Sequence, residues 1–371
     1  MDNKRIFLSS PTMNGTEKLY VDEAFRDNMV IPLGPNVNGF ENKIKEYTGA
    51  GCAVALSSGT AAIHLSLKLA GIKPGDVVFC QSLTFSATAN PITYEKGVPV
   101  FIDSEEDTWN MSPAALEKAF EKYPDCRIVL LVHLFGVPAK IDEIKAICDR
   151  HGAVLIEDAA EALGAKYKGH SVGIDGKYGV LSFNGNKIIT TSGGGMLLTN
   201  DEIGAKKALF WATQSRDNAA WYQHSEIGYN YRMSNICAGI GLGQMNTLDE
   251  FVSKKRRLFD IYKSELSGVS GISFQPSEAC SEPSRWLTSV VGDFDFMKLV
   301  NGLAEKNIEA RPMWKPMHMQ PVFSKCDYIT EKDGISISDK LFNRGICLPS
   351  DIKNTDEDMD RIIDCIKNLI K

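Results

Sequence analysis

Residues 128–158, IVLLVHLFGVPAKIDEIKAICDRHGAVLIED, are the most informative about the fold. Residues 128–132 are apolar throughout, and residues 154–156 form a second apolar run that ends in Glu157-Asp158. Short runs rich in Val, Ile and Leu predict buried strands. Residues 141–150 between them predict a helix. A strand, a helix and a second strand in this order are typical of parallel strands joined by a crossover helix.

The same alternation continues over the first two-thirds of the chain. Further strands are predicted at residues 53–56, 77–80, 99–102, 178–183 and 195–199, and further helices at residues 60–70 and 113–122. Short apolar strands that alternate with helices predict an α/β fold, with a central, mostly parallel sheet and helices on both faces. Ligands bind to such sheets at the carboxyl ends of the strands, so we expect the functional site there.

The sequence changes in character after about Gln244. A long charged helix is predicted over residues 245–266, followed by loops with Gly and Pro, a strand at residues 287–291 and terminal helices. We therefore expect a large domain over residues 1–244 and a smaller α+β domain over residues 245–371, because one core rarely serves so long a chain. The basic run Lys254-Lys255-Arg256-Arg257 is predicted to lie on the solvated face of the long helix.

The composition argues against several classes of protein. The 371 residues include 41 basic and 47 acidic ones with no long basic block, which argues against nucleic-acid binding. The nine cysteines include no Cys-x-x-Cys pair and no Cys/His cluster with zinc spacing, so we expect reduced thiols and no metal site. The amino-terminal residues do not have the pattern of a signal peptide, and the longest apolar stretch, residues 128–135, is too short to span a membrane. The expectation is a soluble, cytoplasmic enzyme.

The first of three candidate site motifs is Ser57-Ser58-Gly59-Thr60-Ala61, between a predicted strand and a predicted helix. Glycine lets a ligand approach the backbone closely, and the free N–H groups and dipole of a helix N-terminus favour a phosphate. The Thr60 hydroxyl adds a further hydrogen bond. Taken alone, the same residues also fit an ordinary helix cap.

Asp158 and Lys187 are the other two candidates. Asp158 ends a strand, where its carboxylate fits a protonated pyridinium nitrogen; a helix cap and a metal ligand are the alternatives. Lys187 lies between the strand at residues 178–183 and the Gly193-Gly194-Gly195 turn. A lysine in a sequestered site is nucleophilic and forms a Schiff base with a cofactor aldehyde, although such glycines also shape ordinary turns.

Four motifs together resemble the DegT/DnrJ/EryC1/StrS sugar aminotransferases over nearly the whole chain. They are Ser58-Gly59-Thr60-Ala61-Ala62, Glu157-Asp158-Ala159-Ala160, Gly185-Asn186-Lys187 and Gly228-Tyr229-Asn230-Tyr231-Arg232. The resemblance implies the fold-type I, aspartate-aminotransferase-like architecture and the cofactor pyridoxal 5'-phosphate, which alternates with pyridoxamine phosphate. It also implies a homodimer with active sites at the subunit interface.

The resemblance implies a role for each residue of the cofactor site. Lys187 would bind the cofactor covalently, and Asp158 would hold its pyridinium nitrogen. The phosphate would be held by Gly59, Thr60, Ala61 and Ser182, and by Asn230 from the other subunit, while Phe85, Asn184 and Glu161 would complete the pocket. Phe85 would stack on the ring, although it also fits plain core packing. Many relatives carry Gln where this chain has Glu161, whose carboxylate would repel an anionic phenolic oxygen unless it is protonated or displaced.

A narrower resemblance concerns the substrate. Residues 182–196 and 311–318 resemble the bacillosamine-pathway transaminases, which aminate C4 of UDP-4-keto-6-deoxy-N-acetylglucosamine, and aminotransferases of Gram-positive exopolysaccharide clusters. The resemblance implies transfer of the amino group from L-glutamate to C4, with Lys187 as acid and base. Candidate contacts to the nucleotide sugar are Arg232, Trp314, Lys315 and His318, although the stretch 311–318 also fits a structural loop.

Several alternatives stay open at the level of sequence. A C3 or dTDP-linked keto sugar is an alternative acceptor within the same family. Dehydratases of the family carry His at the position of Lys187, and some relatives were first regarded as regulators. Gly239-Ile240-Gly241-Leu242-Gly243 superficially resembles a dinucleotide-binding loop. It follows no predicted strand, however, and its third glycine does not have the spacing of the G-x-G-x-x-G pattern. Small residues on a packed helix are expected there instead.

Overall fold

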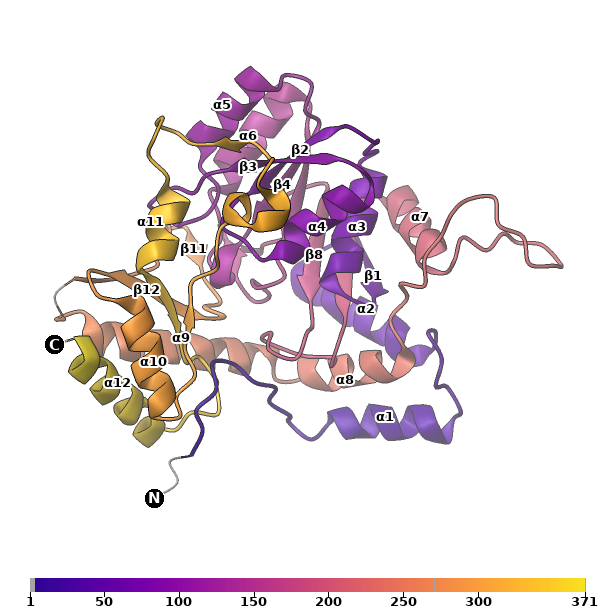
Figure 1. Ribbon diagram of the computed structural model, residues 1–371. Helices are drawn as coiled ribbons and strands as arrows, with labels where there is room; N and C mark the ends of the chain where they lie inside the picture. Colours follow the sequence, from indigo (N-terminus) through magenta and orange to yellow (C-terminus); the bar gives the residue numbers. More distant parts are fainter. Residues whose placement is uncertain (1–3, 270, 371) are drawn as a thin grey trace.

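The computed structural model describes residues 4–269 and 271–370, and its centre is an eight-stranded sheet (Figure 1). The strand order is β1-β9-β8-β5-β4-β2-β3-β14. These strands are β1 (Cys52–Leu56), β2 (Val77–Gln81), β3 (Val98–Ile102), β4 (Ile128–Val132), β5 (Val154–Asp158), β8 (Tyr178–Ser182), β9 (Gly195–Thr199) and β14 (Tyr328–Ile329). Within this sheet only β9 is antiparallel to its neighbours, β1 and β8. The mostly parallel sheet predicted from the sequence is confirmed.

Helices cover both faces of this sheet, as predicted. One face carries α3 (Gly59–Leu69), α4 (Ser86–Tyr94) and α7 (Glu202–Ala212). The other carries α5 (Pro113–Lys122) and α6 (Ile141–His151), and beside them α2 (Pro35–Thr48), α8 (Asn235–Met245) and α9 (Leu248–Leu266). In β4, Val129 and Leu131 pack with α5 and α6, whereas Leu130 packs on the opposite face. Because side chains alternate along a strand, one buried on both faces is apolar throughout.

The glycine run at residues 239–243 lies on helix α8, so the expectation of small residues on a packed helix is confirmed. A Cβ atom at Gly241 would lie 2.7 Å from the ring of Phe40, and one at Gly243 would lie 2.5 Å from the backbone of Glu17. Phe40 belongs to α2, and Glu17 begins α1 (Glu17–Arg26). The glycines therefore let two neighbouring helices approach α8 closely.

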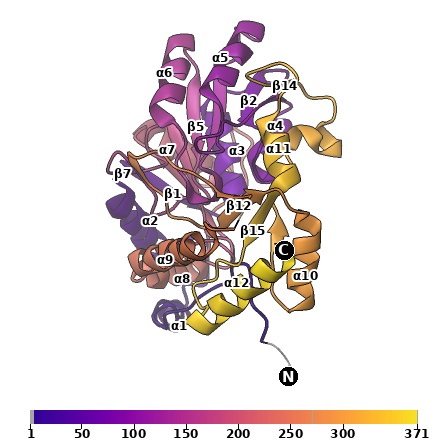
Figure 2. The ribbon, with the colours of Figure 1, turned by 90° about the vertical axis from the view of Figure 1, so that its left-hand side faces the viewer.

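The carboxy-terminal part contains a smaller antiparallel sheet, which lies below the large sheet in Figure 2. Its strand order is β10-β12-β15-β13. The strands are β10 (Ile272–Phe274), β12 (Thr288–Gly292), β13 (Arg311–Pro312) and β15 (Gly345–Leu348), and the helices here are α10 (Phe296–Glu305), α11 (Ile337–Arg344) and α12 (Asp356–Ile370). A third sheet joins β6 (Lys166–Tyr167), β7 (His170–Ser171) and β11 (Ser281–Glu282).

Several contacts join residues on the two sides of the boundary predicted at residues 244/245, and the boundary itself stays a prediction. Tyr328 and Ile329 form β14, which pairs in parallel with β3 and extends the large sheet. Near the amino-terminal end, Ile6 forms a parallel bridge with Ile308. The polypeptide thus passes between the two regions more than once.

Helix α9 differs from its prediction in two ways. It begins at Leu248 because α8 occupies the residues up to Met245. Lys255, predicted to be solvated, is only 3% exposed, since it shares a helix face with Val252 and Phe259 at the helical spacings of three and four residues. Its Nζ donates hydrogen bonds to Ser350 O (2.6 Å) and Ser9 Oγ (3.0 Å). The prediction was wrong for this one residue, whereas Lys254 is exposed.

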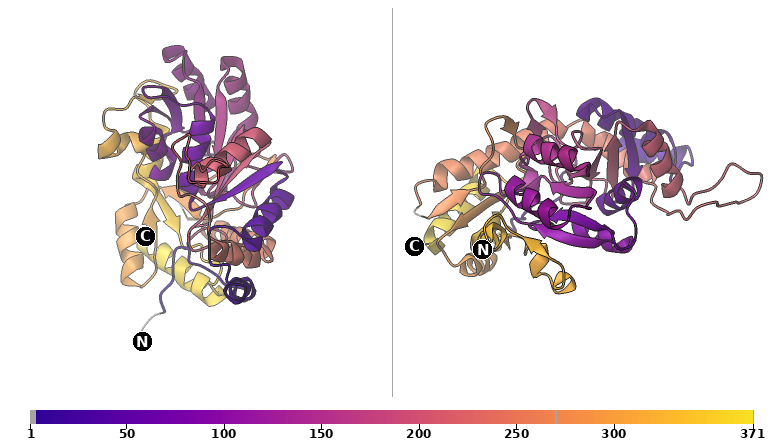
Figure 3. Two further views of the ribbon diagram at one scale, coloured as in Figure 1. Left: turned by 90° about the vertical axis from the view of Figure 1, so that its right-hand side faces the viewer. Right: turned by 90° about the horizontal axis from the view of Figure 1, so that it is seen from above.

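The segment between α7 and α8 extends from the body of the molecule as an arm, here defined as residues 214–228 (Figure 1, and the right-hand view of Figure 3). Trp221, Tyr222 and Ile227 on this arm are 68%, 77% and 80% exposed. All nine cysteines carry free thiols. Across the described ranges, no helix combines the length and the apolar character needed to cross a membrane.

Candidate active site

A cavity of about 590 Å³ opens at the edge of the large sheet where β1, β5 and β8 end and the antiparallel β9 begins. Cavities of this size commonly hold cofactors and substrates. Nine of the residues predicted from the sequence line it: Gly59, Thr60, Phe85, Asp158, Glu161, Ser182, Asn184, Lys187 and Trp314. The predicted residues Ala61, Asn230, Arg232, Lys315 and His318 do not line it in this chain. The cavity lies at the strand ends, where the sequence analysis placed the functional site, and its role stays a prediction.

The N-terminus of α3 forms one end of the cavity. The first N–H groups of a helix have no intrahelical acceptor. Ser58 Oγ accepts the N–H of Ala61 at 3.0 Å, so Ala61 is engaged in the helix cap. Gly59 and Thr60 line the cavity beside Ser182. The backbone N–H groups at this helix end and the Ser182 hydroxyl therefore suit a phosphate.

Two glycines let β8 and β9 approach this helix end closely. A Cβ atom on Gly59 would lie 3.1 Å from the Cβ of Ser182. A Cβ atom on Gly195, the first residue of β9, would lie 2.3 Å from the carbonyl carbon of Ser58. Because any side chain at 195 would push the strand away from the helix cap, the geometry of this end depends on the absence of a side chain there.

Asp158 lies at the end of β5 and is 5% exposed. Its Oδ2 accepts a hydrogen bond from Thr88 Oγ1 at 2.7 Å, and its Oδ1 accepts one from Ala160 N–H at 3.1 Å. Burial raises the pKa of Asp158, while the hydrogen bonds and the charge of Lys187 oppose this rise. A positive charge next to a buried carboxylate stabilises its ionised form, and a protonated pyridinium nitrogen is such a group.

Lys187 lies between Glu161 and an indole ring. Its Nζ is 3.5 Å from Glu161 Oε1 and 4.0 Å from the centroid of Trp286. Glu161 Oε2 accepts the N–H of Phe135 at 2.8 Å. Burial raises the pKa of Glu161 to about 7, and the charge of Lys187 opposes this rise. Burial therefore favours the protonated form of the carboxyl group beside the lysine.

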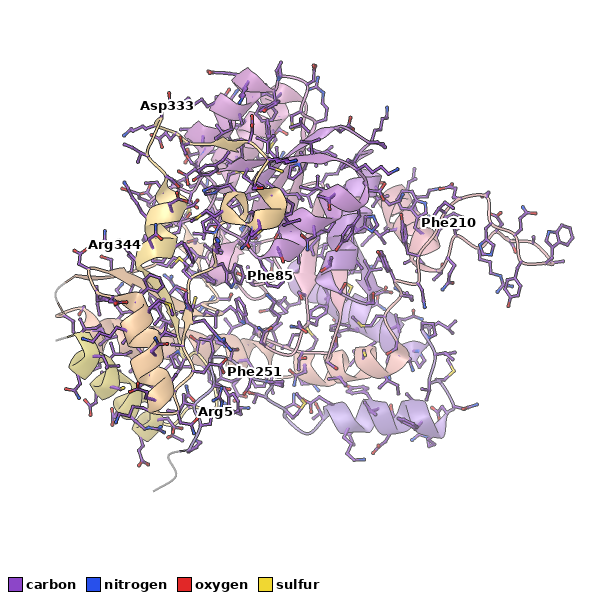
Figure 4. All side chains as sticks on the ribbon, in the orientation of Figure 1. Arg5, Phe85, Phe210, Phe251, Asp333 and Arg344 are labelled. Carbon is purple, nitrogen blue, oxygen red and sulfur yellow. The ribbon has the colours of Figure 1, made fainter. Side chains whose placement is uncertain are left out.

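Aromatic side chains form one wall of the cavity. The ring of Trp314 lies 5.5 Å from that of Phe85, 5.1 Å from that of Phe135 and 6.2 Å from that of Trp286. Phe85 is 56% exposed and lies near the middle of the molecule (Figure 4). The alternative of plain core packing for Phe85 is therefore wrong, and its ring is free to cover a ligand.

Sequence reasoning missed several residues of the site. Trp286 Nε1 and Ser9 Oγ both donate to the carbonyl of Asn186, at 2.6 Å and 2.9 Å, and so fix the residue before Lys187. Trp286 and Ser9 come from distant loops without a motif of their own. Thr88, which holds Asp158, had a usable signal, because it follows the predicted residue Phe85 in the first turn of α4, the helix after β2.

The predicted residues outside the cavity have other partners. The Arg232 guanidinium pairs with Glu41 and donates to Ala55 O. His318 Nδ1 lies 2.7 Å from Ser82 Oγ and its Nε2 lies 2.9 Å from Asp339 Oδ1, while burial lowers its pKa. Lys315 is exposed. Asn230 is exposed at the base of the arm, where its Oδ1 accepts a hydrogen bond from Gln214.

The arrangement fits pyridoxal phosphate without requiring a metal. It combines phosphate-binding N–H groups, a buried carboxylate for the ring nitrogen, a primary amine for an aldehyde and an aromatic ring for stacking. Among residues 4–269 and 271–370, no group of three or more His, Cys, Asp or Glu side chains is close enough to hold a metal ion.

Comparison with known proteins adds an independent line of support. The profile of the DegT/DnrJ/EryC1/StrS aminotransferase family matches residues 11–367. A Bacillus subtilis protein named as a pyridoxal phosphate-dependent aminotransferase, EpsN, is 52% identical over 99% of this chain and 96% of its own length. GDP-perosamine synthase of Escherichia coli O157:H7 is 37% identical over 94% and 93% of the two chains. The crystal structure of a DegT DnrJ EryC1 StrS aminotransferase from Brucella abortus is 28% identical and superposes with a TM-score of 0.89, covering 96% and 95% of the two chains.

Proposed function

Because the chain belongs to the DegT/DnrJ/EryC1/StrS aminotransferase family, we propose that it transfers the amino group of L-glutamate to C4 of a nucleotide-linked 4-keto-6-deoxy sugar. The enzyme class, a pyridoxal phosphate-dependent aminotransferase of the sugar aminotransferase family, follows from that membership. The observation that supports the catalytic part of the proposal is the presence of the Lys187 amine and the buried Asp158 carboxylate in one cavity beside a helix N-terminus.

We propose the following roles for the residues that would hold the cofactor. The N–H groups at Gly59 and Thr60 bind the phosphate, together with the Ser182 hydroxyl. Asp158, held by Thr88, keeps a proton on the ring nitrogen. Phe85 covers the ring and excludes water. When bound, the cofactor supplies a carbon that carries the amino group between substrates and a ring that takes up an electron pair.

Lys187 then has two tasks in this proposal. Its amine would hold the cofactor covalently through the cofactor's aldehyde, until the amine of the donor takes its place. The freed amine would act as the base that accepts the proton from the Cα atom of the donor and as the acid that gives a proton back. In the second half-reaction it works in reverse and delivers a proton to C4 of the sugar. The position of Glu161, 3.5 Å from the amine, gives Lys187 a nearby group with which to exchange a proton.

The covalent role of Lys187 is tested by absorbance and mass spectrometry. The enzyme is expected to be yellow, to bleach on addition of borohydride, and to retain the cofactor mass on the peptide that contains Lys187. Lys187→Ala and Lys187→Arg are expected to lack turnover. Full activity in either variant would refute the assignment, as would a colourless protein that binds nicotinamide cofactors or DNA.

The identity of the acceptor is the finer part of the proposal. Residues 182–196 and 311–318 support a UDP-linked 4-keto sugar by their resemblance to the bacillosamine branch. The relative named GDP-perosamine synthase makes a GDP-linked sugar an acceptor to be tested as well. Incubation of the pure enzyme with glutamate and a panel of UDP-, dTDP- and GDP-linked 3-keto and 4-keto sugars, followed by NMR of the products, decides between them. Amination at C3 alone would contradict the proposal.

We also propose that the enzyme works in the cytoplasm as a homodimer whose arms reach the partner's active site. The arm carries large exposed apolar side chains at residues 221, 222 and 227, and such side chains grouped on one projecting segment mark an interaction surface. The arm is held in shape by hydrogen bonds, including Ser225 Oγ to Asp217 at 2.8 Å. Asn230 lies at its base, away from the cavity of its own chain. This placement supports a contribution from Asn230 to the phosphate site of the other subunit.

A further inference from the structure

The cavity wall carries more acidic than cationic side chains, and this limits which residues can bind an anionic substrate. The acidic side chains that line it are Asp158, Glu161 and Glu309. In the described part of the chain, the only cationic side chains that line it are Lys187 and Arg311. Lys187 is engaged with the cofactor in the proposed reaction. Among the described residues, Arg311 is therefore the one guanidinium on this cavity wall that can bind an anionic group of a substrate.

Arg311 projects from a strand, which fixes where its side chain starts. In the small antiparallel sheet Arg311 of β13 lies opposite Cys347 of β15. Residues directly opposite each other on antiparallel strands project on the same face. Cys347 is buried and lines the cavity, so this face of the sheet closes one side of it. The Arg311 side chain itself is 66% exposed, as expected for a residue at the mouth of the cavity.

The present partner of Arg311 is Glu309, which also has other partners. Arg311 Nη2 lies 2.9 Å from Glu309 Oε1. Glu309 Oε2 accepts the N–H of Leu8 at 3.3 Å and lies 3.8 Å from Arg5 Nη2. An ion pair with so exposed a partner contributes little stability, because water competes with it. Glu309 can lose Arg311 and keep its contacts with the amino-terminal segment.

We infer that Arg311 is the anion-binding residue of the substrate site and that Glu309 is its exchangeable counterion. When a substrate enters, its anionic oxygens replace Glu309 Oε1 on the guanidinium. The planar guanidinium binds carboxylates and phosphates through paired hydrogen bonds. Both proposed substrates carry such oxygens, glutamate in its carboxylates and the nucleotide sugar in its diphosphate. This inference rests on the proposed function and adds to it the residue that receives the charged part of a substrate.

Measuring the two half-reactions one at a time shows whether Arg311 binds glutamate or the nucleotide sugar. With glutamate alone, the holoenzyme passes to its amine form, and the change in cofactor absorbance reports the donor half-reaction. The amine form is then mixed with the keto sugar nucleotide, and the reverse change reports the acceptor half-reaction. Arg311→Gln is expected to raise the apparent substrate dissociation constant about tenfold to a hundredfold in the half-reaction whose substrate it binds, as for the loss of a charged hydrogen-bonded contact. Arg311→Lys is expected to raise the same dissociation constant by a smaller factor, because it keeps the positive charge but not the planar guanidinium.

The Glu309→Gln variant distinguishes an exchangeable counterion from a purely structural ion pair, because only the former predicts tighter substrate binding. The amide oxygen of Gln still accepts the N–H of Leu8, but it no longer competes for Arg311. The variant is expected to bind the same substrate a few-fold more tightly, opposite in sign to Arg311→Gln. Arg257→Gln is the matched control, since Arg257 is 62% exposed and pairs with Asp356 at 2.6 Å away from the cavity.

Direct titration of the holoenzyme with UDP and with glutarate tests the inference without turnover. Weaker binding of either probe to Arg311→Gln, with an unchanged cofactor spectrum, supports it even if none of the tested sugars reacts. An Arg311→Gln variant that matches Arg257→Gln in both titrations and both half-reactions overturns it. So does a variant whose main defect is lost cofactor or a lowered melting temperature, or a Glu309→Gln variant that binds more weakly. Absence of any spectral change with glutamate would instead contradict the proposed function.

Discussion

Glu161 is a residue of the site whose charge state depends on its surroundings. Its raised pKa of about 7 exceeds the usual value of 4.5 because it is buried. The folded protein therefore retains a proton that the unfolded chain loses, so the stabilising contribution of Glu161 is complete below about pH 4.5 and is lost as the pH rises through about 7.

The Glu161→Gln variant tests the direction of this pH dependence of stability. In the cofactor-free enzyme, the free energy of unfolding of the wild type should fall relative to that of Glu161→Gln by about 1 kcal/mol per pH unit across this window. Urea unfolding at a series of pH values measures the difference. Parallel stability curves for the two proteins would contradict a buried, protonated carboxyl group at this position.

Lys255 behaves in the opposite way. Burial lowers its pKa to about 7 from the usual 10.5. A neutral amine still has the two N–H groups that the bonds to Ser350 and Ser9 require. Because the unfolded chain holds the proton to higher pH, stability rises with pH between these two values.

Lys255→Met removes the titrating group at similar length. The wild type should therefore gain stability relative to Lys255→Met by about 1 kcal/mol per pH unit between pH 7 and 10. Lys254→Met, a change at the exposed neighbour, should leave the pH dependence of the wild type intact. A constant difference between wild type and Lys255→Met would show that the amine stays charged in the fold.

At the scale of residues, the sequence predicts what is local and misses what is not. Asp158 could be chosen because it ends a recognisable strand, and Lys187 because it lies between a recognisable strand and a glycine-rich turn. Trp286 could not, because its contact with Lys187 joins loops nearly a hundred residues apart. Lys255 was misjudged because a run of four basic residues suggests solvent, whereas the helical repeat places one of them among Val252 and Phe259.

At the scale of elements, the meeting of β9 with the cap of α3 controls the phosphate end of the cavity. Gly195→Ala places a Cβ atom against the Ser58 backbone, and overpacking of this kind costs about 1–3 kcal/mol. We expect at least a tenfold weaker affinity for pyridoxal phosphate, measured by spectral titration, because the N–H groups at Gly59 and Thr60 shift. Gly268→Ala is the control, since a Cβ atom there has no neighbour within 4 Å. Equal affinities in the two variants would contradict this role for the close approach.

The strands were the most predictable elements. Each predicted strand of the large sheet is present with its ends displaced by at most two residues, because apolar runs buried on both faces have no other environment available. The break between α8 and α9 was not predicted. Gly239, Gly241 and Gly243 lower helix propensity, and it is their contacts with α1 and α2 that stabilise α8.

At the scale of the whole molecule, the arm makes the clearest prediction. If it packs on a second subunit, the double variant Trp221→Ser/Tyr222→Ser should weaken the dimer about a thousandfold, since buried aromatic contacts of this kind contribute about 2 kcal/mol each. Analytical ultracentrifugation over a dilution series measures this. Val322→Ser, which changes a side chain 77% exposed but outside the arm, should have no effect. A wild-type protein that stays monomeric at micromolar concentration would contradict the dimer.

Mixed subunits test whether Asn230 acts across that interface. Lys187→Ala and Asn230→Ala are each expected to be inactive or severely impaired. A dimer with one subunit of each kind contains one site with both intact residues, so unfolding and refolding the two variants together should restore part of the activity. No recovery on mixing would place the action of Asn230 within its own subunit.

The return of the chain to the large sheet at β14 also limits how these proteins can be recombined. A chimera that exchanges everything after residue 244 between two relatives would import a foreign strand edge against β3 and a foreign partner for Ile6. A chimera with crossover points on both sides of residues 328–329 would keep β14 paired with its original neighbour β3. Such a chimera could transfer acceptor preference from one relative to another without disturbing the large sheet.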